Sequence, residues 1–162
     1  MIDIRAPRLK TNRRVVLIGS MSVYAELLEY SKLLNSKGIQ TVVPEPEDEG
    51  VQQLSLFEFE TFKRRVSFAY LRKIRHPSTF CVLAINLDRH GILNYIGPNT
   101  FAEIAVAFAQ SKKIYLLQAM PEAYADELSA WRVAPLRGNL ETLVEDFRDS
   151  VGIDNQQLGL FD

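Results

Sequence analysis

The sequence predicts a doubly wound α/β domain with a five-stranded parallel sheet and helices on both of its faces. Two observations carry this prediction. Five short apolar runs, of the kind that form strands buried on both faces, occur along the chain. Each run is followed by a segment with the apolar spacing of a helix. Such alternation requires right-handed crossovers between parallel strands, which is typical of flavodoxin-like domains.

The predicted strands are short apolar runs bounded by residues that favour turns. The first run ends at Gly19, and the second is stopped by Pro44. The third contains Cys81 and ends near Leu87. The predicted strands cover residues 15–18, 41–43, 81–87, 114–117 and 132–135.

The segments between the strands place apolar residues on one helical stripe. The first helix is expected to run from about Val23 to a stop at Gly38. The other helices are expected over residues 59–75, 100–110, 122–131 and 139–151. The side chains expected to face the core are Phe59, Phe62, Val66, Ala69 and Tyr70 in the second helix, and Phe101, Ile104, Ala105 and Phe108 in the third.

Length and composition predict one globular domain over residues 1–153, followed by a flexible tail over residues 154–162. Of the 162 residues, 47% are hydrophobic and 24% are charged, as in ordinary globular proteins. The net charge of −1 gives no basis for direct binding of nucleic acid or of an anionic membrane. No apolar stretch is long enough to span a bilayer and no signal core is evident. A lone Cys81 in an apolar run favours a reducing compartment, so we expect a cytoplasmic protein.

Two segments with small or polar side chains follow predicted strands at the edge where open parallel sheets bind ligands. Gly19, Ser20 and Met21 follow the first strand. Asn86 and Asp88 lie at the end of the third strand. Because the carboxyl ends of parallel strands share one edge of the sheet, we expect these residues to line one substrate site.

A third segment leads into the helix expected from residue 100. Gly97 permits close approach of the backbone to a ligand, and Asn99 and Thr100 offer short polar side chains that hold a phosphate or a sugar hydroxyl. The free N–H groups at a helix N-terminus also favour anions. Glu103 is expected in the first helical turn, at the same rim.

Local pattern leaves the role of Glu103 open. Residues 100–103, Thr-Phe-Ala-Glu, fit a capping box, in which Glu103 accepts a hydrogen bond from a free backbone N–H at the helix start. The alternative is a carboxylate that faces a ligand. The glycine-containing loop before it matches neither the Walker pattern nor the dinucleotide fingerprint, and it is equally compatible with an ordinary turn.

Residues 94–100 with Glu103, followed by residues 112–117, resemble the nucleoside 2-deoxyribosyltransferase-like superfamily, as do residues 16–21. The resemblance covers roughly residues 14–136 and is closest to the branch with a Tyr-Ile-Gly-x-Asn-Thr-x-x-Glu signature. It implies a flavodoxin-like fold, a homo-oligomer, and cleavage or transfer of the N-glycosidic bond of a deoxynucleoside or deoxynucleoside monophosphate.

The resemblance also implies roles for individual residues. Glu103 matches the nucleophile, a carboxylate that stabilises positive charge on the sugar and then traps it as a covalent glycosyl-enzyme. The departing base needs a proton, for which Asp88 is the candidate. Asn86 is expected to orient the base or the sugar, and Tyr95 to hydrogen-bond Glu103 or a sugar hydroxyl. His76 and His90 are isolated, so neither a metal site nor a cofactor is expected.

A second hypothesis is a non-catalytic nucleotide-binding or adaptor module. The enzymes of the superfamily usually carry an aromatic hydroxyl directly after the first strand, whereas Tyr24 of this chain is expected inside the helix. Two peptides, residues 53–57 and the tail from Gln157 to Phe161, resemble the sequence with which bacterial proteins bind the replicative sliding clamp. In such a peptide a Leu and a Phe enter an apolar groove. Residues 54, 56 and 57 are also compatible with packing at the start of the second helix of their own domain, and residues 158, 160 and 161 with folding back onto the domain.

Overall fold

The computed structural model describes residues 10–46 and 49–159. Its centre is a sheet of five strands in the order β2-β1-β3-β4-β5, and every pairing is parallel. This order confirms the predicted doubly wound α/β class and is that of flavodoxin-like proteins. The strands are β1 (Arg14–Ile18), β2 (Thr41–Val42), β3 (Thr79–Ala84), β4 (Lys113–Leu116) and β5 (Ala134–Pro135).

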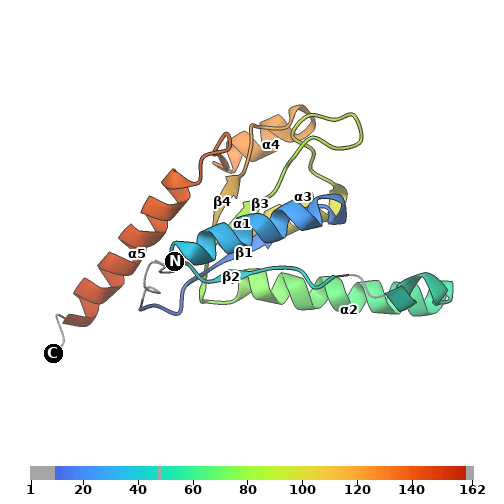
Figure 1. The fold of residues 1–162 in the computed structure, drawn as a ribbon, viewed down its shortest axis with the longest axis horizontal. Coiled ribbons are helices and arrows are strands. Elements are labelled where there is room, and N and C mark those ends of the chain that lie inside the picture. The colour runs from blue at the N-terminus through green and yellow to red at the C-terminus, as the bar shows by residue number, and fades with distance from the viewer. Residues whose placement is uncertain (1–9, 47–48, 160–162) are drawn as a thin grey trace, which may run out of the picture.

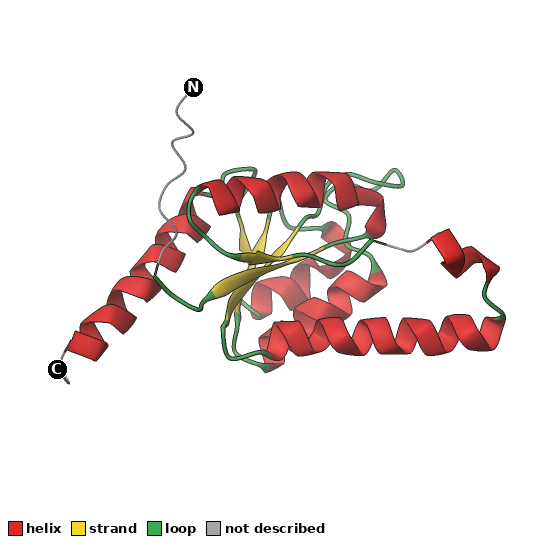
Figure 2. Ribbon diagram, turned by 60° about the horizontal axis from the view of Figure 1, so that its bottom comes forward, coloured by secondary structure: helices red, strands yellow, loops and turns green. Residues whose placement is uncertain are grey.

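Helices cover both faces of the sheet (Figure 2). One face carries α1 (Tyr24–Ser36) and α5 (Glu141–Gly159). The other face carries α2 (Leu56–Arg75), α3 (Pro98–Ala109) and α4 (Ala125–Ala130). Short 3-10 helices lie at η1 (Met21–Val23), η2 (Glu49–Gln53) and η3 (Glu122–Tyr124). Within the described ranges, no helix is both long and apolar enough to span a membrane.

Alternate residues of each strand enter two separate cores. In β1, Val15 and Leu17 pack in the core shared with α1 and α5, whereas Val16 and Ile18 pack in the core shared with α2, α3 and α4. Successive side chains of a strand point to opposite faces, so a strand buried on both faces must be apolar throughout. This requirement explains the continuous apolar runs.

After the neighbouring strands β1 and β3, the chain continues toward opposite sides of the sheet. The chain leaves β1 toward β2 on one side and leaves β3 toward β4 on the other. In the register of the sheet, Ile18 at the end of β1 lies beside Ala84 at the end of β3. The region between two such diverging connections is where open α/β sheets bind ligands.

Several predicted elements begin or end at other residues than the observed ones, and the differences at β3 and α3 affect the site. Strand β3 begins at Thr79 and ends at Ala84, which leaves residues 85–87 in the loop beyond it. Helix α3 begins at Pro98 rather than at residue 100. Proline lacks the N–H that is unpaired at the first helical position anyway, so it suits this place.

Helix α5 is longer than predicted. It continues to Gly159, so most of the segment expected to be a loose tail from residue 154 is helical. Arg13, just before β1, donates two hydrogen bonds to Asp154, of 2.6 and 2.9 Å. This ion pair joins the start of the sheet to the last turns of α5. Residues 160–162 lie outside the described residues.

Helix α2 differs most from expectation. Only its last two turns reach the sheet, through the buried Tyr70 and Ile74, and its first half projects beyond the domain (Figure 1). The prediction that Phe59, Val66 and Ala69 face inward is therefore wrong, since all three are exposed. Helical spacing correctly places these apolar residues on one face of α2. The stripe, however, continues along the helix beyond the part that packs against the sheet.

A smaller correction concerns α3. Ile104 is buried as predicted, whereas Phe108 is 47% exposed. The Phe108 ring stacks on Trp131 with 5.1 Å between ring centroids. Phe108 therefore lies at the rim of the α3–α4 contact rather than in the core.

Candidate functional site

The candidate site lies at the carboxyl ends of β1 and β3, and Gly19 lets these two segments come close together. A Cβ at Gly19 would lie 3.2 Å from Cγ2 of Val23 and 3.4 Å from the carbonyl oxygen of Ile85. The absence of a side chain therefore allows η1 to pack tightly against the end of β3. The Ile85 N–H donates to the Ile18 carbonyl at 2.9 Å and fixes the two strand ends together.

Ser20 and Met21 form the β1 side of this site. The Ser20 hydroxyl accepts a hydrogen bond of 3.3 Å from the Ser22 N–H and thereby caps η1. It also lies 2.9 Å from the Ser22 hydroxyl. Met21 is 40% exposed. This side of the site thus presents hydroxyl groups and a flexible thioether side chain.

The start of α3 forms the β3 side of the site. Gly97 is its N-cap and makes no side-chain capping bond, and Pro98 follows it. The first intrahelical bond runs from the Phe101 N–H to the Gly97 carbonyl at 3.0 Å. The N–H groups of Asn99 and Thr100 have no carbonyl one turn earlier to bind. The helix therefore offers free donors and the positive end of its dipole to an anion.

Tyr95 explains why glycine occupies position 97. A Cβ at Gly97 would lie 3.1 Å from the Tyr95 hydroxyl oxygen, so the tyrosine packs directly over the glycine backbone. The Tyr95 ring also meets His90 edge-on, with 5.0 Å between centroids. Within the described residues no hydrogen bond joins Tyr95 to Glu103, and that predicted contact stays a prediction.

Asp88 holds the loop between β3 and α3. Its Oδ1 accepts a 2.8 Å hydrogen bond from the Asn94 N–H, and the Tyr95 N–H donates to the Leu87 carbonyl at 3.1 Å. Asn94 has a positive φ of 53°, which asparagine tolerates better than most residues. Asp88 is exposed, and within the described residues its second carboxylate oxygen accepts no hydrogen bond.

Asn86 is buried and joins the loops that follow β3 and β4. Its Nδ2 donates to the Ala119 carbonyl at 2.8 Å, and its Oδ1 accepts from the Gln118 N–H at 2.8 Å. Only 1% of Asn86 is exposed. These bonds position the backbone around the site, and direct binding of a base or sugar by Asn86 stays a prediction.

Glu103 lies in the second turn of α3, one turn further along than expected. Because Gly97 is the N-cap, Glu103 is the sixth residue of the helix and does not cap its start. The capping-box interpretation is therefore wrong. Within the described part of the chain, no hydrogen bond or ion pair involves the Glu103 carboxylate. Burial raises the pKa of Glu103 to about 7.

Tyr70 of α2 is a site residue that sequence reasoning missed. Its hydroxyl donates to the carbonyl of Leu17, one residue before the end of β1. Burial, and next the nearby Glu103 carboxylate, raise the pKa of Tyr70, so the hydroxyl stays protonated. An aromatic hydroxyl thus lies beside β1, where the charge of Glu103 affects its pKa. The sequence did offer a signal, since Tyr70 lies in an apolar stripe. A tyrosine buried there needs an acceptor for its hydroxyl group, which predicts a hydrogen bond to another element.

The candidate site residues that come from separate segments of the chain therefore lie at one edge of the sheet. Strand β1 brings Gly19, Ser20 and Met21 to this edge, and the β3 side brings Asn86 and the start of α3. No group of three His, Cys, Asp or Glu side chains that could hold a metal ion occurs among the described residues.

Comparison with known proteins does not extend this description. No family model matches the chain, and no curated protein or solved structure matches it significantly.

Proposed function

We propose that the protein cleaves or transfers the N-glycosidic bond of a deoxynucleoside or deoxynucleoside monophosphate, with Glu103 as the nucleophile. The observation that carries this proposal is the state of the Glu103 carboxylate, which is partly buried and makes no hydrogen bond or ion pair within the described residues. A carboxylate that loses water without gaining a partner destabilises the fold. Such perturbed groups concentrate at functional sites.

The chemistry needs a carboxylate beneath the sugar. As the bond between C1′ and the base nitrogen breaks, its electron pair leaves with the base and positive charge develops on the sugar. A Glu103 oxygen then bonds to C1′, and Asp88 supplies the proton that the departing base takes up. Water, or the N–H nitrogen of a second base, then attacks C1′ and gives its proton to the Asp88 carboxylate, while the ester bond between C1′ and Glu103 breaks and Glu103 is released as a carboxylate. The first choice gives hydrolysis and the second gives transfer.

The rest of the site suits the sugar or its 5′-phosphate. The free N–H groups at the start of α3 and the hydroxyl of Ser20 are donors for phosphate oxygens. Thr100, which is buried, and Asn99, which is exposed, flank these N–H groups. This donor set supports a small-molecule ligand of nucleoside or nucleotide type.

The test is to incubate the pure protein with a panel of deoxynucleosides and their monophosphates, with and without an acceptor base, and to separate the products. We expect free base from the unmodified protein and a loss on the order of 10³-fold in Glu103→Gln, because the amide cannot form the glycosyl ester. Glu127→Gln, at an exposed position of α4, is the matched control and should keep full activity. A demonstrated activity that survives Glu103→Gln unchanged contradicts the proposal.

Assembly and location complete this proposal. The superfamily resemblance supports a homo-oligomer. The lone Cys81 is free and completely buried, which supports a cytoplasmic protein that does not depend on disulfides.

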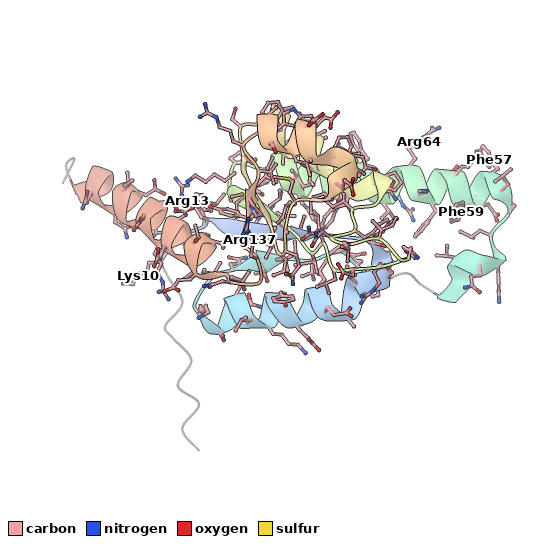
Figure 3. The ribbon with its side chains drawn as sticks, turned by 90° about the horizontal axis from the view of Figure 1, so that it is seen from above. Lys10, Arg13, Phe57, Phe59, Arg64 and Arg137 are labelled. Carbon is pink, nitrogen blue, oxygen red and sulfur yellow. The ribbon has the colours of Figure 1, made fainter. Side chains whose placement is uncertain are left out.

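A second candidate function, an adaptor that binds the sliding clamp, is favoured by the exposure of residues 53–57. Leu56 is 75% exposed and Phe57 is 78% exposed at the tip of α2 (Figure 3). The interpretation that these two side chains pack on their own domain is therefore wrong. The similar peptide at residues 157–161 lies partly outside the described residues, and its clamp docking stays a prediction.

A binding measurement tests the adaptor function. If the peptide enters an apolar groove of the clamp, Leu56→Ala with Phe57→Ala should weaken binding of purified clamp by at least about tenfold. Ile153→Ala, at an exposed apolar position on α5, should leave the affinity unchanged. Absence of binding by the unmodified chain excludes this function.

A further inference from the structure

The part of α2 that precedes Tyr70 carries an apolar stripe that nothing in the described structure covers. Phe59 is 38% exposed and Val66 is 46% exposed, although both lie on a helix whose other end is buried through Tyr70 and Ile74. Figure 3 shows Phe57 and Phe59 far from the sheet, at the outer end of the helix. Exposed apolar patches of this kind mark interaction surfaces.

The stripe has the spacing with which one helix packs along another. Phe59, Phe62, Val66 and Ala69 follow one another at intervals of three, four and three residues. This is the alternating pattern of a helix pair, in which the apolar residues of each helix fill the gaps of the other. A shallow groove of about 290 Å³ runs beside Phe62 on the same half of the helix.

The charged residues beside this stripe would face residues of opposite charge if two copies of α2 packed antiparallel. Glu58 and Arg65 are seven residues apart and flank the stripe on the same side, where both line the groove. Each of the two comes directly before an apolar residue of the stripe, Phe59 or Val66. In an antiparallel pair of identical helices, residues at this place in the seven-residue repeat face each other. Glu58 of each copy then lies opposite Arg65 of the other, and the two-fold axis repeats the pair.

We propose that the stripe is covered by the α2 helix of a second copy of this chain, antiparallel to the first. Phe59 and Phe62 of both copies form the centre of the contact, and the two Glu58–Arg65 pairs flank it. This arrangement places the two sheets at opposite ends of the helix pair. This inference rests on the proposed homo-oligomer and supplies its interface. Its test measures molecular mass, whereas the test of the proposed activity measures release of free base, so each proposal can fail without the other.

Charge exchange tests the pairing and its direction. We expect the unmodified chain to have twice the mass of one chain by light scattering during gel filtration, and to dissociate on dilution. Glu58→Arg and Arg65→Glu should each raise the dissociation constant at least about tenfold, because each places like charges opposite one another. The double variant, with Glu58→Arg and Arg65→Glu, should dimerise again.

The double variant distinguishes an antiparallel pair from a parallel one. Glu58 also belongs to the capping box with Ser55, but Glu58→Arg and the double variant lose that cap equally. A parallel pair would bring Glu58 near Lys63 instead. The double variant would leave that contact repulsive. A double variant that stays monomeric while both proteins remain folded overturns the antiparallel arrangement.

An apolar variant completes the experiment. Phe59→Ser should abolish the dimer without lowering the stability of the isolated chain, since Phe59 is exposed. Ile153→Ser, which removes a 57% exposed apolar side chain from α5, should leave the dimer intact. A chain that is monomeric at all concentrations, or a dimer that persists in Phe59→Ser, overturns the proposal.

Discussion

Glu103 is a half-buried carboxylate whose protonation affects the stability of the fold. In the folded protein, burial raises its pKa to about 7, against 4.5 in water. The ionised carboxylate therefore destabilises the fold at neutral pH, and in the proposed reaction Glu103 acts as a nucleophile only above about pH 7. A proton bound at Glu103 favours folding, and in the proposed reaction it opposes catalysis.

This coupling predicts how stability depends on pH. As the pH rises from about 4.5 to about 7, the unfolded chain releases the Glu103 proton while the folded chain still binds it, so the free energy of unfolding falls. The total loss is about 3 kcal/mol for a shift of this size, and it is complete above pH 7. Glu103→Gln has no such proton, so it should lack this decrease and be more stable than the unmodified protein at pH 8.

Urea unfolding at several values between pH 5 and 8 measures the effect. Glu122→Gln, at an exposed position, is the control and should retain the pH dependence of the unmodified protein. An identical pH dependence in Glu103→Gln would show that the carboxylate is solvated in the folded state.

At the scale of elements, the loops after β3 and β4 are positioned by one side chain. Asn86 binds the backbone of Gln118 and Ala119 through both ends of its amide. The start of α3 follows the same loop, so the free N–H groups of the candidate site depend on this connection. Asn86 therefore contributes to the site even without direct contact to a ligand.

Removing the Asn86 amide should destabilise the protein. Asn86→Ala leaves the half-buried N–H of Gln118 and carbonyl of Ala119 without their partner, which costs about 2 kcal/mol in the free energy of unfolding. Asn99→Ala, at an exposed position nearby, is the matched control and should change it by less than about 0.5 kcal/mol. Chemical denaturation of both variants measures the difference. Equal stability of the two variants would contradict the role assigned to the Asn86 bonds.

Helix α2 shows that one element can serve two environments. Its last turns, with Tyr70 and Ile74, belong to the core of the domain, whereas the stripe from Phe59 to Ala69 lies beyond the sheet. Helical periodicity reports which side chains share a face, but it does not report what lies opposite that face. The inward-facing prediction was therefore correct for Tyr70 and wrong for Phe59 and Val66.

At the scale of the whole molecule, the strand order brings the candidate site together. The connections from β1 and β3 leave the sheet in opposite directions, which brings residues 19–21 and the start of α3 to one edge of the sheet. Tyr70 reaches the same place from α2, because its hydroxyl binds Leu17, 53 positions earlier in the chain. If α2 pairs with a second copy, this tyrosine also links the site to the interface.

The sequence by itself determined the alternation of strands and helices, and therefore the parallel sheet and the edge at which Ser20, Asn86 and Gly97 meet. These features follow from local spacing, because a strand buried on both faces must be apolar throughout and parallel strands require crossovers. It could not place the boundary at which α3 begins, and so it left the capping interpretation of Glu103 open.

Only the tertiary structure decided that Glu103 stands without a partner among the described residues, that its charge reaches Tyr70, and that no described residue covers the stripe on α2. Each of these facts depends on contacts between segments far apart in the chain, or on the absence of such contacts. Local spacing fixes the face of an element on which a side chain lies. The packing of the whole chain fixes whether that face meets a core, a ligand or another molecule.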